Sequence, residues 1–166
     1  GVVALIESAR GIANVNEIAA AHRVTRLAFG ALDYAADLGL SGDVRGLIHP
    51  SAAVALGSRL SNLPLPIAAP TVSLDDEDMI AEDVRFAQAL GFGAKLCIHP
   101  RQVPVVRRAF APSAESIAWA GRVVAAADAG SGAAQVDGSM VDKPVVERAR
   151  AILALARSLD SARDVA

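Results

Sequence analysis

The sequence predicts an α/β fold on a parallel sheet, in which four βα units form half of a (β/α)₈ barrel. As far as residue 100, short apolar runs alternate with segments of helical character, an order typical of βα units. Beyond that point the alternation stops and two longer helical segments follow. We therefore expect a half-barrel over residues 1–110 and a C-terminal arm of helices over residues 111–166, packing on the barrel or on a neighbouring subunit.

The strands are expected where apolar residues run together between turn-forming residues. They cover residues 2–6, 24–29, 65–72 and 95–98. The third strand should be short or irregular, because Pro64, Pro66 and Pro70 have no N–H to donate to a neighbouring strand. The fourth strand ends at His99 and Pro100.

The helices are expected where a capping residue, or a proline in the first turn, precedes a periodic segment. They cover residues 15–22, 50–61, 77–90, 114–128 and 144–159. Asp76, Ser113 and Asp142 each stand before one of these helices and can cap it. The glycines of residues 130–132 separate the last two helices, and an extended stretch over residues 133–141 follows them.

Composition excludes several classes of partner. No apolar run approaches the ~20 residues of a membrane-spanning helix, so we expect no membrane partner. The net charge is −2, from 16 Lys and Arg against 18 Asp and Glu, and the basic residues are dispersed, so no nucleic-acid partner is expected. One cysteine, Cys97, and no basic-then-apolar leader predict a cytoplasmic protein.

Two features of the sequence indicate that the predicted half-barrel needs further residues or a second subunit to cover it. Gly1 is followed at once by an apolar run, so we expect residues upstream to be missing from the chain. Half a barrel also leaves two edge strands and apolar surface uncovered. Either the upstream residues or self-association can cover that surface.

Two carboxylates follow the first two strands, at the end of the sheet where (β/α)₈ enzymes place their chemistry. Glu7 directly follows residues 2–6, and Asp33 lies just beyond residues 24–29. Adjacent strands lie about 4.8 Å apart, so the side chains can converge, and a cation such as Mg²⁺ would relieve their repulsion. The alternative is that Glu7 pairs with Arg10 and that Asp33 is a turn residue.

Two further polar residues each have a functional and a structural explanation. His99 can bind substrate at the same rim together with Arg101 and Gln102, or it can be a core histidine before a helix that starts at Pro100. Asp142 can act in catalysis, or it can simply be the N-cap of the last helix.

Four segments carry a resemblance to a known family. They are LIESARG (5–11), FGALDY (29–34), ALGFGAKLCIHPRQ (89–102) and DGSMVDKP (137–144). These segments resemble the citrate lyase beta subunit-like proteins of the HpcH/HpaI aldolase superfamily, together with malyl-CoA, citramalyl-CoA and β-methylmalyl-CoA lyases. The resemblance runs from residue 2 to about residue 157, in the family's order.

The resemblance implies the fold and the ligands. The chain would hold the second half of a TIM barrel, strands five to eight, plus a C-terminal helical arm. In the family a Glu after the fifth strand and an Asp after the sixth bind Mg²⁺, and these positions fall on Glu7 and Asp33. A 2-oxo acid chelates the metal, and backbone N–H groups at Gly30, Ala31 and Leu32 are candidate donors to its carboxylate.

The resemblance also implies the activity and the partners. The family catalyses reversible aldol- or Claisen-type cleavage of a carbon–carbon bond in a 3-hydroxy-acyl-CoA or acyl-carrier thioester. A homo-oligomer, trimer or hexamer, is expected, in which Asp142 on the arm serves acid–base chemistry at the neighbouring subunit's site.

One implication limits the others. The family also uses an Arg and other groups from its first four strands, and this chain has none of those strands. The chain as given should therefore not be a complete enzyme. The alternative function is a non-catalytic structural subunit or fragment of the family that binds metal or ligand.

Overall fold

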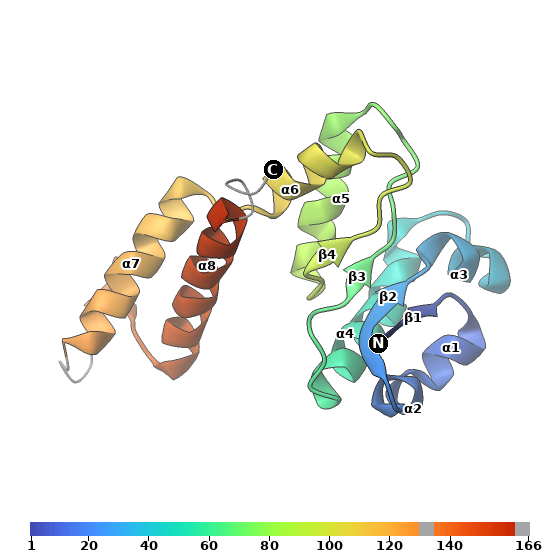
Figure 1. The fold of residues 1–166 in the computed structure, drawn as a ribbon, viewed down its shortest axis with the longest axis horizontal. Helices are drawn as coiled ribbons and strands as arrows, with labels where there is room; N and C mark the ends of the chain where they lie inside the picture. Colours follow the sequence, from blue (N-terminus) through green and yellow to red (C-terminus); the bar gives the residue numbers. More distant parts are fainter. Residues whose placement is uncertain (130–134, 162–166) are drawn as a thin grey trace. The chain divides into compact units, whose positions relative to one another are not determined.

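The chain forms two compact units in the computed structural model, which describes residues 1–129 and 135–161 (Figure 1). The first unit is Gly1–Phe110 and the second is Ala111–Ala166. Among the described residues, no helix is long and apolar enough to cross a lipid bilayer.

The first unit contains a four-stranded parallel sheet in the order β1-β2-β3-β4. Its strands are β1 (Val2–Ile6), β2 (Val24–Phe29), β3 (Ile67–Ala68) and β4 (Ala94–Lys95). The first two strands have the predicted bounds, and the third is short, as its prolines predict. The prediction of residues 95–98 for the fourth strand is wrong, because β3 offers only Ile67 and Ala68 as pairing partners.

Six helices and one 3₁₀ turn lie in this unit. They are α1 (Ala9–Ala13), α2 (Val15–Ala20), α3 (Ala31–Leu38), η1 (Val44–Leu47), α4 (Ile48–Leu60), α5 (Glu77–Ala89) and α6 (Gln102–Phe110). The predicted helix over 50–61 begins two residues earlier, and that over 77–90 is confirmed to within one residue. The predicted helix over 15–22 is α2, which ends two residues earlier, and the short helix α1 precedes it where a loop was expected. The sequence did not predict α3, because Gly30 occupies its N-cap position and no side chain caps the helix.

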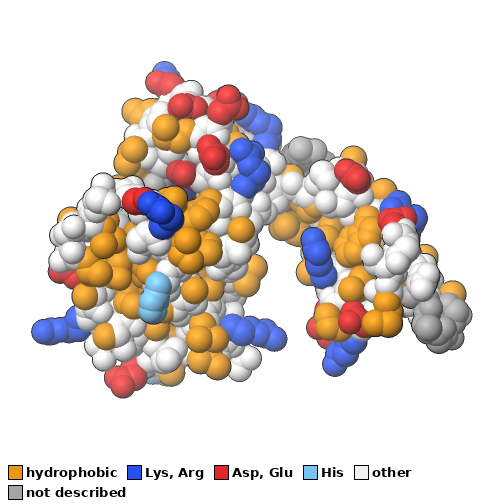
Figure 2. Space-filling view, turned by 180° about the vertical axis from the view of Figure 1, so that it is seen from behind, with side chains coloured by type: hydrophobic (Ala, Val, Ile, Leu, Met, Phe, Trp, Pro, Cys, Tyr) orange, Lys and Arg blue, Asp and Glu red, His pale blue; other side chains and the backbone are white. Residues whose placement is uncertain are grey.

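Helices cover one face of the sheet. Ile6, Leu27 and Ala68 from three strands are buried in one cluster with side chains of α2, α3, α4 and α5. The alternate residues Val3 and Leu5 of β1 are 54% and 49% exposed, so the other face of this strand carries uncovered apolar side chains. Apolar side chains also cover much of the first unit in Figure 2.

Side-chain donors supplement the two-residue strand β3 along the proline-rich segment 65–73. Arg26 donates to the Leu65 carbonyl at 2.7 Å, and Lys95 donates to the Ala69 carbonyl at 2.6 Å. Gln102, only 1% exposed, donates to the carbonyls of Thr71 and Ser73 at 2.9 and 2.8 Å. The Gln102 carbonyl oxygen accepts from the Ile98 N–H at 2.9 Å. One amide therefore ties the loop after β3 to the loop after β4.

The second unit is a helical hairpin closed by a small β-ribbon. Its elements are α7 (Ala114–Asp128), β5 (Gln135–Val136), β6 (Ser139–Met140) and α8 (Lys143–Ser161). The predicted bounds of α7 are confirmed, and α8 exceeds its predicted range by one residue at its start and two at its end. The glycine break at 130–132 lies outside the described residues. Ala120 and Val123 of α7 are buried against Ala149 of α8.

Replacing Gln102 by Leu should lower the free energy of unfolding by about 2 to 4 kcal/mol. The substitution leaves two buried carbonyls and one N–H without a partner, and each such group costs about 1 to 3 kcal/mol. Chemical denaturation measures the loss. Gln88→Leu, at an exposed position of α5, is the matched control and should change stability little. Equal effects of the two substitutions would contradict the role given to Gln102.

Candidate metal and substrate site at the ends of two strands

Glu7 and Gly30 lie side by side at the carboxyl ends of β1 and β2. Ile6 pairs with Phe29 in the parallel register, so the next residue of each strand is Glu7 and Gly30. The Gly30 N–H donates to the Ile6 carbonyl at 2.9 Å and continues the ladder by one bond. This pairing fixes the backbone under the Glu7 side chain.

Glycine is required beside Glu7 for a steric reason. A Cβ atom placed on Gly30 would lie 2.6 Å from the Cβ of Glu7 and 3.0 Å from its Oε2. The nearest atom belongs to the base of the Glu7 side chain, which cannot rotate away. The φ angle of Gly30 is −90°, an ordinary value for any residue, so close approach alone selects glycine here.

Asp33 is carried on the first turn of α3, directly after Gly30. Tyr34 anchors this turn, because its ring lies 5.6 Å from the ring of Phe29 and the side chain is buried. Asp33 itself is exposed and Glu7 is half-buried. Neither carboxylate makes an ion pair or hydrogen bond with any described residue, so the structure does not show the Glu7–Arg10 pair considered from the sequence. Asp33 is a helical residue rather than a turn residue.

Backbone donors stand next to the two carboxylates. The sequence suggested Gly30, Ala31 and Leu32 as free donors in a loop. The Gly30 N–H is not free, because the Ile6 carbonyl accepts it. Ala31 and Leu32 are the first two residues of α3, where N–H groups have no intrahelical acceptor and the helix dipole is positive. This end of α3 can therefore accept an anionic group.

The chemistry of these groups fits a hard divalent cation. Two carboxylates without described protein partners, one after β1 and one in the helical turn after β2, are oxygen ligands of the kind Mg²⁺ prefers. Across residues 1–129 and 135–161 there is no group of three or more His, Cys, Asp or Glu side chains able to hold a metal ion. A cation at Glu7 and Asp33 would therefore keep positions for water or for substrate oxygens.

His99 follows β4, at the same end of the sheet but at the edge opposite β1. Its side chain is half-buried, and its Nδ1 accepts a hydrogen bond from the Arg101 N–H at 3.2 Å. The structure thus gives His99 a local partner and does not place it beside Glu7. Arg101 forms an exposed pair with Asp75 at 3.3 Å.

Asp142 lies in the second unit, immediately before α8. Its Oδ1 accepts from the Val145 N–H at 3.1 Å, and its backbone carbonyl accepts from the Val146 N–H at 3.0 Å. Asp142 is therefore the N-cap that the sequence analysis considered. The capping bond uses one carboxylate oxygen, and Met140, two residues earlier, is 66% exposed.

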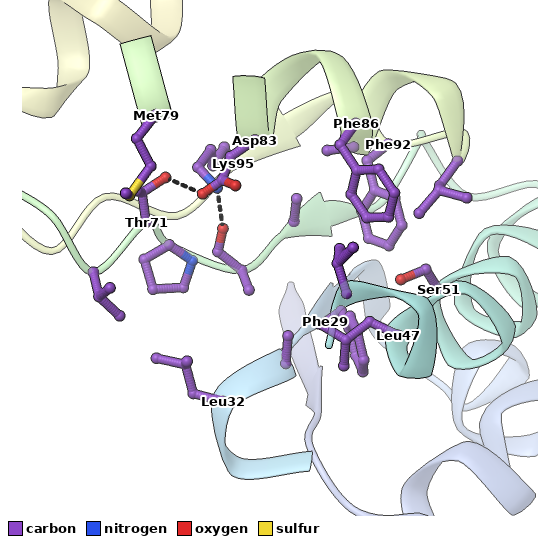
Figure 3. Close-up of a pocket in the computed structure, with 18 of the residues that line it drawn as sticks. Phe29, Leu32, Leu47, Ser51, Thr71, Met79, Asp83, Phe86, Phe92 and Lys95 are labelled. Atoms are coloured by element: carbon purple, nitrogen blue, oxygen red, sulfur yellow. Dashed lines mark hydrogen bonds and ion pairs between the residues drawn. The ribbon is translucent and has the colours of Figure 1, made fainter. Parts of the chain in front are cut away.

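A polar cluster that was not predicted from the sequence lies on the helix-covered side of the sheet (Figure 3). Lys95 pairs in register with Ala68, so its side chain enters the layer between sheet and helices and is only 4% exposed. Its Nζ lies 3.6 Å from the Oδ2 of Asp83 in α5, and the Thr71 hydroxyl donates to the same oxygen at 2.5 Å. One feature of the sequence could have indicated this cluster: the charged residue Asp83 lies between Ile80 and Val84, which are apolar positions of α5.

Burial has the largest effect on the pKa of Lys95. Removal from solvent lowers the pKa of Lys95 below its usual value, and the nearby Asp83 carboxylate partly opposes the shift. Burial also raises the pKa of the Cys97 thiol, with the Lys95 charge opposing it.

Comparison with known proteins gives consistent matches. Residues 1–100 match the family described as HpcH/HpaI aldolase/citrate lyase. A citrate lyase subunit beta-like protein of Mycobacterium tuberculosis H37Rv is 39% identical over 161 residues, covering 92% of this chain and 58% of that protein. Citrate lyase subunit beta of Escherichia coli K12 is 34% identical over 165 residues, covering 94% of this chain and 54% of that protein.

A solved structure matches both units. The protein CitE from Mycobacterium tuberculosis, crystallised with magnesium, acetoacetate and coenzyme A, is 38% identical with a TM-score of 0.83. The match covers 93% of this chain and 60% of that chain. The chain thus spans somewhat more than half the length of the relatives it matches.

Replacing Gly30 by Ala should lower the free energy of unfolding by about 1 to 3 kcal/mol, because the new Cβ overlaps the Cβ of Glu7. The loss should be smaller when Glu7 is also replaced by Gly, and a double-mutant cycle of thermal or chemical unfolding measures that coupling. Gly121→Ala is the control, since its Cβ meets nothing within 4 Å and alanine favours the helix α7. Strict additivity of the Gly30 and Glu7 changes would rule out the proposed contact.

Proposed function

Because the chain belongs to the HpcH/HpaI aldolase/citrate lyase family, we propose that it supplies the metal site of a Mg²⁺-dependent carbon–carbon lyase. The proposed substrate is a 3-hydroxy-acyl-CoA or acyl-carrier thioester, cleaved into a 2-oxo acid and an acyl thioester. The observation that carries the proposal is the pair of unpartnered carboxylates: Glu7 directly after β1, and Asp33 in the first turn of the helix that follows the neighbouring strand β2. The magnesium, acetoacetate and coenzyme A bound to the similar CitE protein support it.

Glu7 and Asp33 are the proposed protein ligands of Mg²⁺. When bound there, the cation would act as a Lewis acid toward the oxygen atoms of the oxo acid or hydroxy-acyl group. The Ala31 and Leu32 N–H groups, at the positive end of α3, would bind the carboxylate of the same molecule. The contact between Gly30 and Glu7 keeps the two sets of groups adjacent. The role of His99 in binding substrate stays a prediction.

The fold proposed for the whole site is a (β/α)₈ barrel, of which this chain provides the second half, strands five to eight. Three features support this proposal. The strands are parallel and neighbours in chain order, and Val3 and Leu5 expose apolar side chains on the uncovered face. The chain also covers only 58% of its Mycobacterium tuberculosis relative. A first half-barrel packed on that face would cover these side chains.

Asp142 is the proposed acid–base residue, acting on the site of a neighbouring subunit within a trimer or hexamer. In cleavage the 3-hydroxyl loses a proton, the bond between C2 and C3 breaks, and C2 of the departing acyl thioester gains a proton. Asp142 would donate the proton to C2 in this direction and remove it in the reverse direction. Its capping bond orients the carboxylate without using both oxygens.

A second candidate function is a non-catalytic subunit or fragment that binds metal or ligand. The observation in its favour is that His99 has a local partner, the Arg101 N–H, and lies at the edge of the sheet opposite β1 rather than beside Glu7. Metal binding without cleavage of any malyl-, citramalyl- or citryl-thioester, with Mg²⁺ present, would favour this function over the lyase.

Asp33→Asn should raise the dissociation constant for Mg²⁺ by at least about tenfold, the loss that even an outer partner of a metal ligand causes. The fold should be retained, since Asp33 is exposed and has no described partner. Isothermal titration calorimetry on the intact protein measures the affinity. Asp78→Asn, another exposed carboxylate in a first helical turn, is the control and should leave the affinity unchanged. Unchanged affinity in Asp33→Asn would refute the metal assignment.

Asp142→Asn should abolish cleavage in the intact protein while stability and oligomer size stay nearly unchanged, because asparagine caps helices as well as aspartate does. Mixing this variant with Asp33→Asn protein should restore part of the activity, since some mixed sites would contain both aspartates. Subunit exchange is verified by mass spectrometry of differently labelled proteins. Exchange without any return of activity would show that Asp142 does not act across a subunit boundary.

A further inference from the structure

A cavity lies in the first unit, on the helix-covered side of the sheet, and neither Glu7 nor Asp33 lines it. It has a volume of about 340 Å³ and lies between β3, α4 and α5 (Figure 3). This volume is within the range of small-molecule sites. The walls are mainly apolar, and aromatic rings of Phe29, Phe86 and Phe92 contribute to them. Ala31 and Leu32, which precede Asp33 on α3, also line it.

Three of the four polar side chains that line the cavity form one cluster, and the fourth, Ser51, lies on α4. Lys95, Asp83 and Thr71 all line it, and Figure 3 shows them together with the Phe86 and Phe92 rings elsewhere on the wall. The Lys95 side chain is 4% exposed and that of Asp83 is 44% exposed. Thr71 is 2% exposed. A ligand in the cavity would therefore meet a mainly apolar wall with one charged cluster and, apart from it, the Ser51 hydroxyl.

The hydrogen bonds of Lys95 leave one donor available. An ammonium group has three N–H bonds. The Ala69 carbonyl accepts one at 2.6 Å, and the Asp83 carboxylate faces a second across 3.6 Å. Among the described residues no further acceptor is present for the third. A buried donor without an acceptor is costly, so an oxygen atom of a ligand placed there would be stabilised.

The charges of the cluster select the kind of ligand. Lys95 and Asp83 together are neutral, so an anion in the cavity would add an unpaired buried charge next to the Asp83 carboxylate. An uncharged molecule avoids that cost and still accepts the free hydrogen bond. Its remaining surface must be apolar, because the rest of the wall offers few polar partners.

We propose that this cavity is a binding site for an uncharged, largely apolar small molecule whose carbonyl oxygen accepts a hydrogen bond from Lys95. The bound molecule would lie between α4 and α5 and contact the first turn of α3. The site does not depend on the metal chemistry proposed above, and its occupancy can be measured in the absence of Mg²⁺ and of any lyase substrate.

Three probes of similar size test the proposal on the intact protein without Mg²⁺: acetophenone, ethylbenzene and benzoate. Acetophenone should bind about tenfold more tightly than ethylbenzene, a difference of about 1.4 kcal/mol, because only the ketone accepts from Lys95. Benzoate should bind more weakly than acetophenone. Calorimetry gives the affinities, and crystals soaked in acetophenone give the position, with the ketone oxygen at Lys95. No acetophenone binding, equal affinity for ethylbenzene, or preference for benzoate would overturn the proposal.

Variants then assign the effect to the cavity. Lys95→Met keeps the length of the side chain and removes the donor, so it should abolish the preference for acetophenone over ethylbenzene. Ala87→Leu should weaken both probes at least tenfold, since Ala87 lines the cavity and a larger side chain fills it. Lys143→Met, at a lysine that is 86% exposed, is the control and should change nothing. If Lys95→Met still prefers acetophenone over ethylbenzene, the proposed hydrogen bond is wrong. If a variant fails to fold, the affinities of the wild-type protein for the three probes still test the proposal.

Discussion

The parallel pairing of β1 with β2 is the constraint on which the candidate site depends. This ladder runs from Val2 to Ile6 on one strand and from Val24 to Phe29 on the other, whereas β3 and β4 have two residues each. Because the ladder extends to Ile6 and Phe29, the two following residues must lie side by side. Glycine at position 30 lets the side chain of Glu7 cross its neighbour's backbone, and Tyr34 then holds α3 against the end of β2.

The other half of the sheet is held by a different means. Prolines in the segment 64–70 remove N–H donors, so a regular ladder cannot form there. Instead, the side chains of Arg26, Lys95 and Gln102 donate hydrogen bonds to carbonyl oxygens of the segment. Two of these side chains are buried, and burial strengthens their bonds but also makes every unpaired polar group costly. The hydrogen bond from Lys95 to the Ala69 carbonyl also holds the Lys95 ammonium beside a mainly apolar cavity.

The second unit is a helical hairpin, and its proposed role depends on Asp142. This residue caps α8 and is also the proposed acid–base residue. Ser113 and Asp142 cap its two long helices, and small buried side chains let these helices pack closely. A catalytic residue that is also an N-cap has its carboxylate oriented by the backbone of its own helix. Helix capping alone is a sufficient reason for an aspartate at position 142, whereas the proposed acid–base role depends on what its second carboxylate oxygen contacts.

The sequence by itself determined the alternation of strands and helices, the bounds of β1, β2 and α7, the capping residues of α5, α7 and α8, and the family motifs around Glu7 and Asp33. These features are local, because apolar runs, capping side chains and prolines act within a few residues of the chain. Tertiary structure alone decided that Gly30 must lack a side chain, that α3 begins there without a capping group, and that Gln102 is buried between two loops. It also decided that Lys95 faces the helices rather than the strand-end rim. Each of these outcomes depends on which residue a partner strand places opposite, and that register joins positions far apart in the sequence.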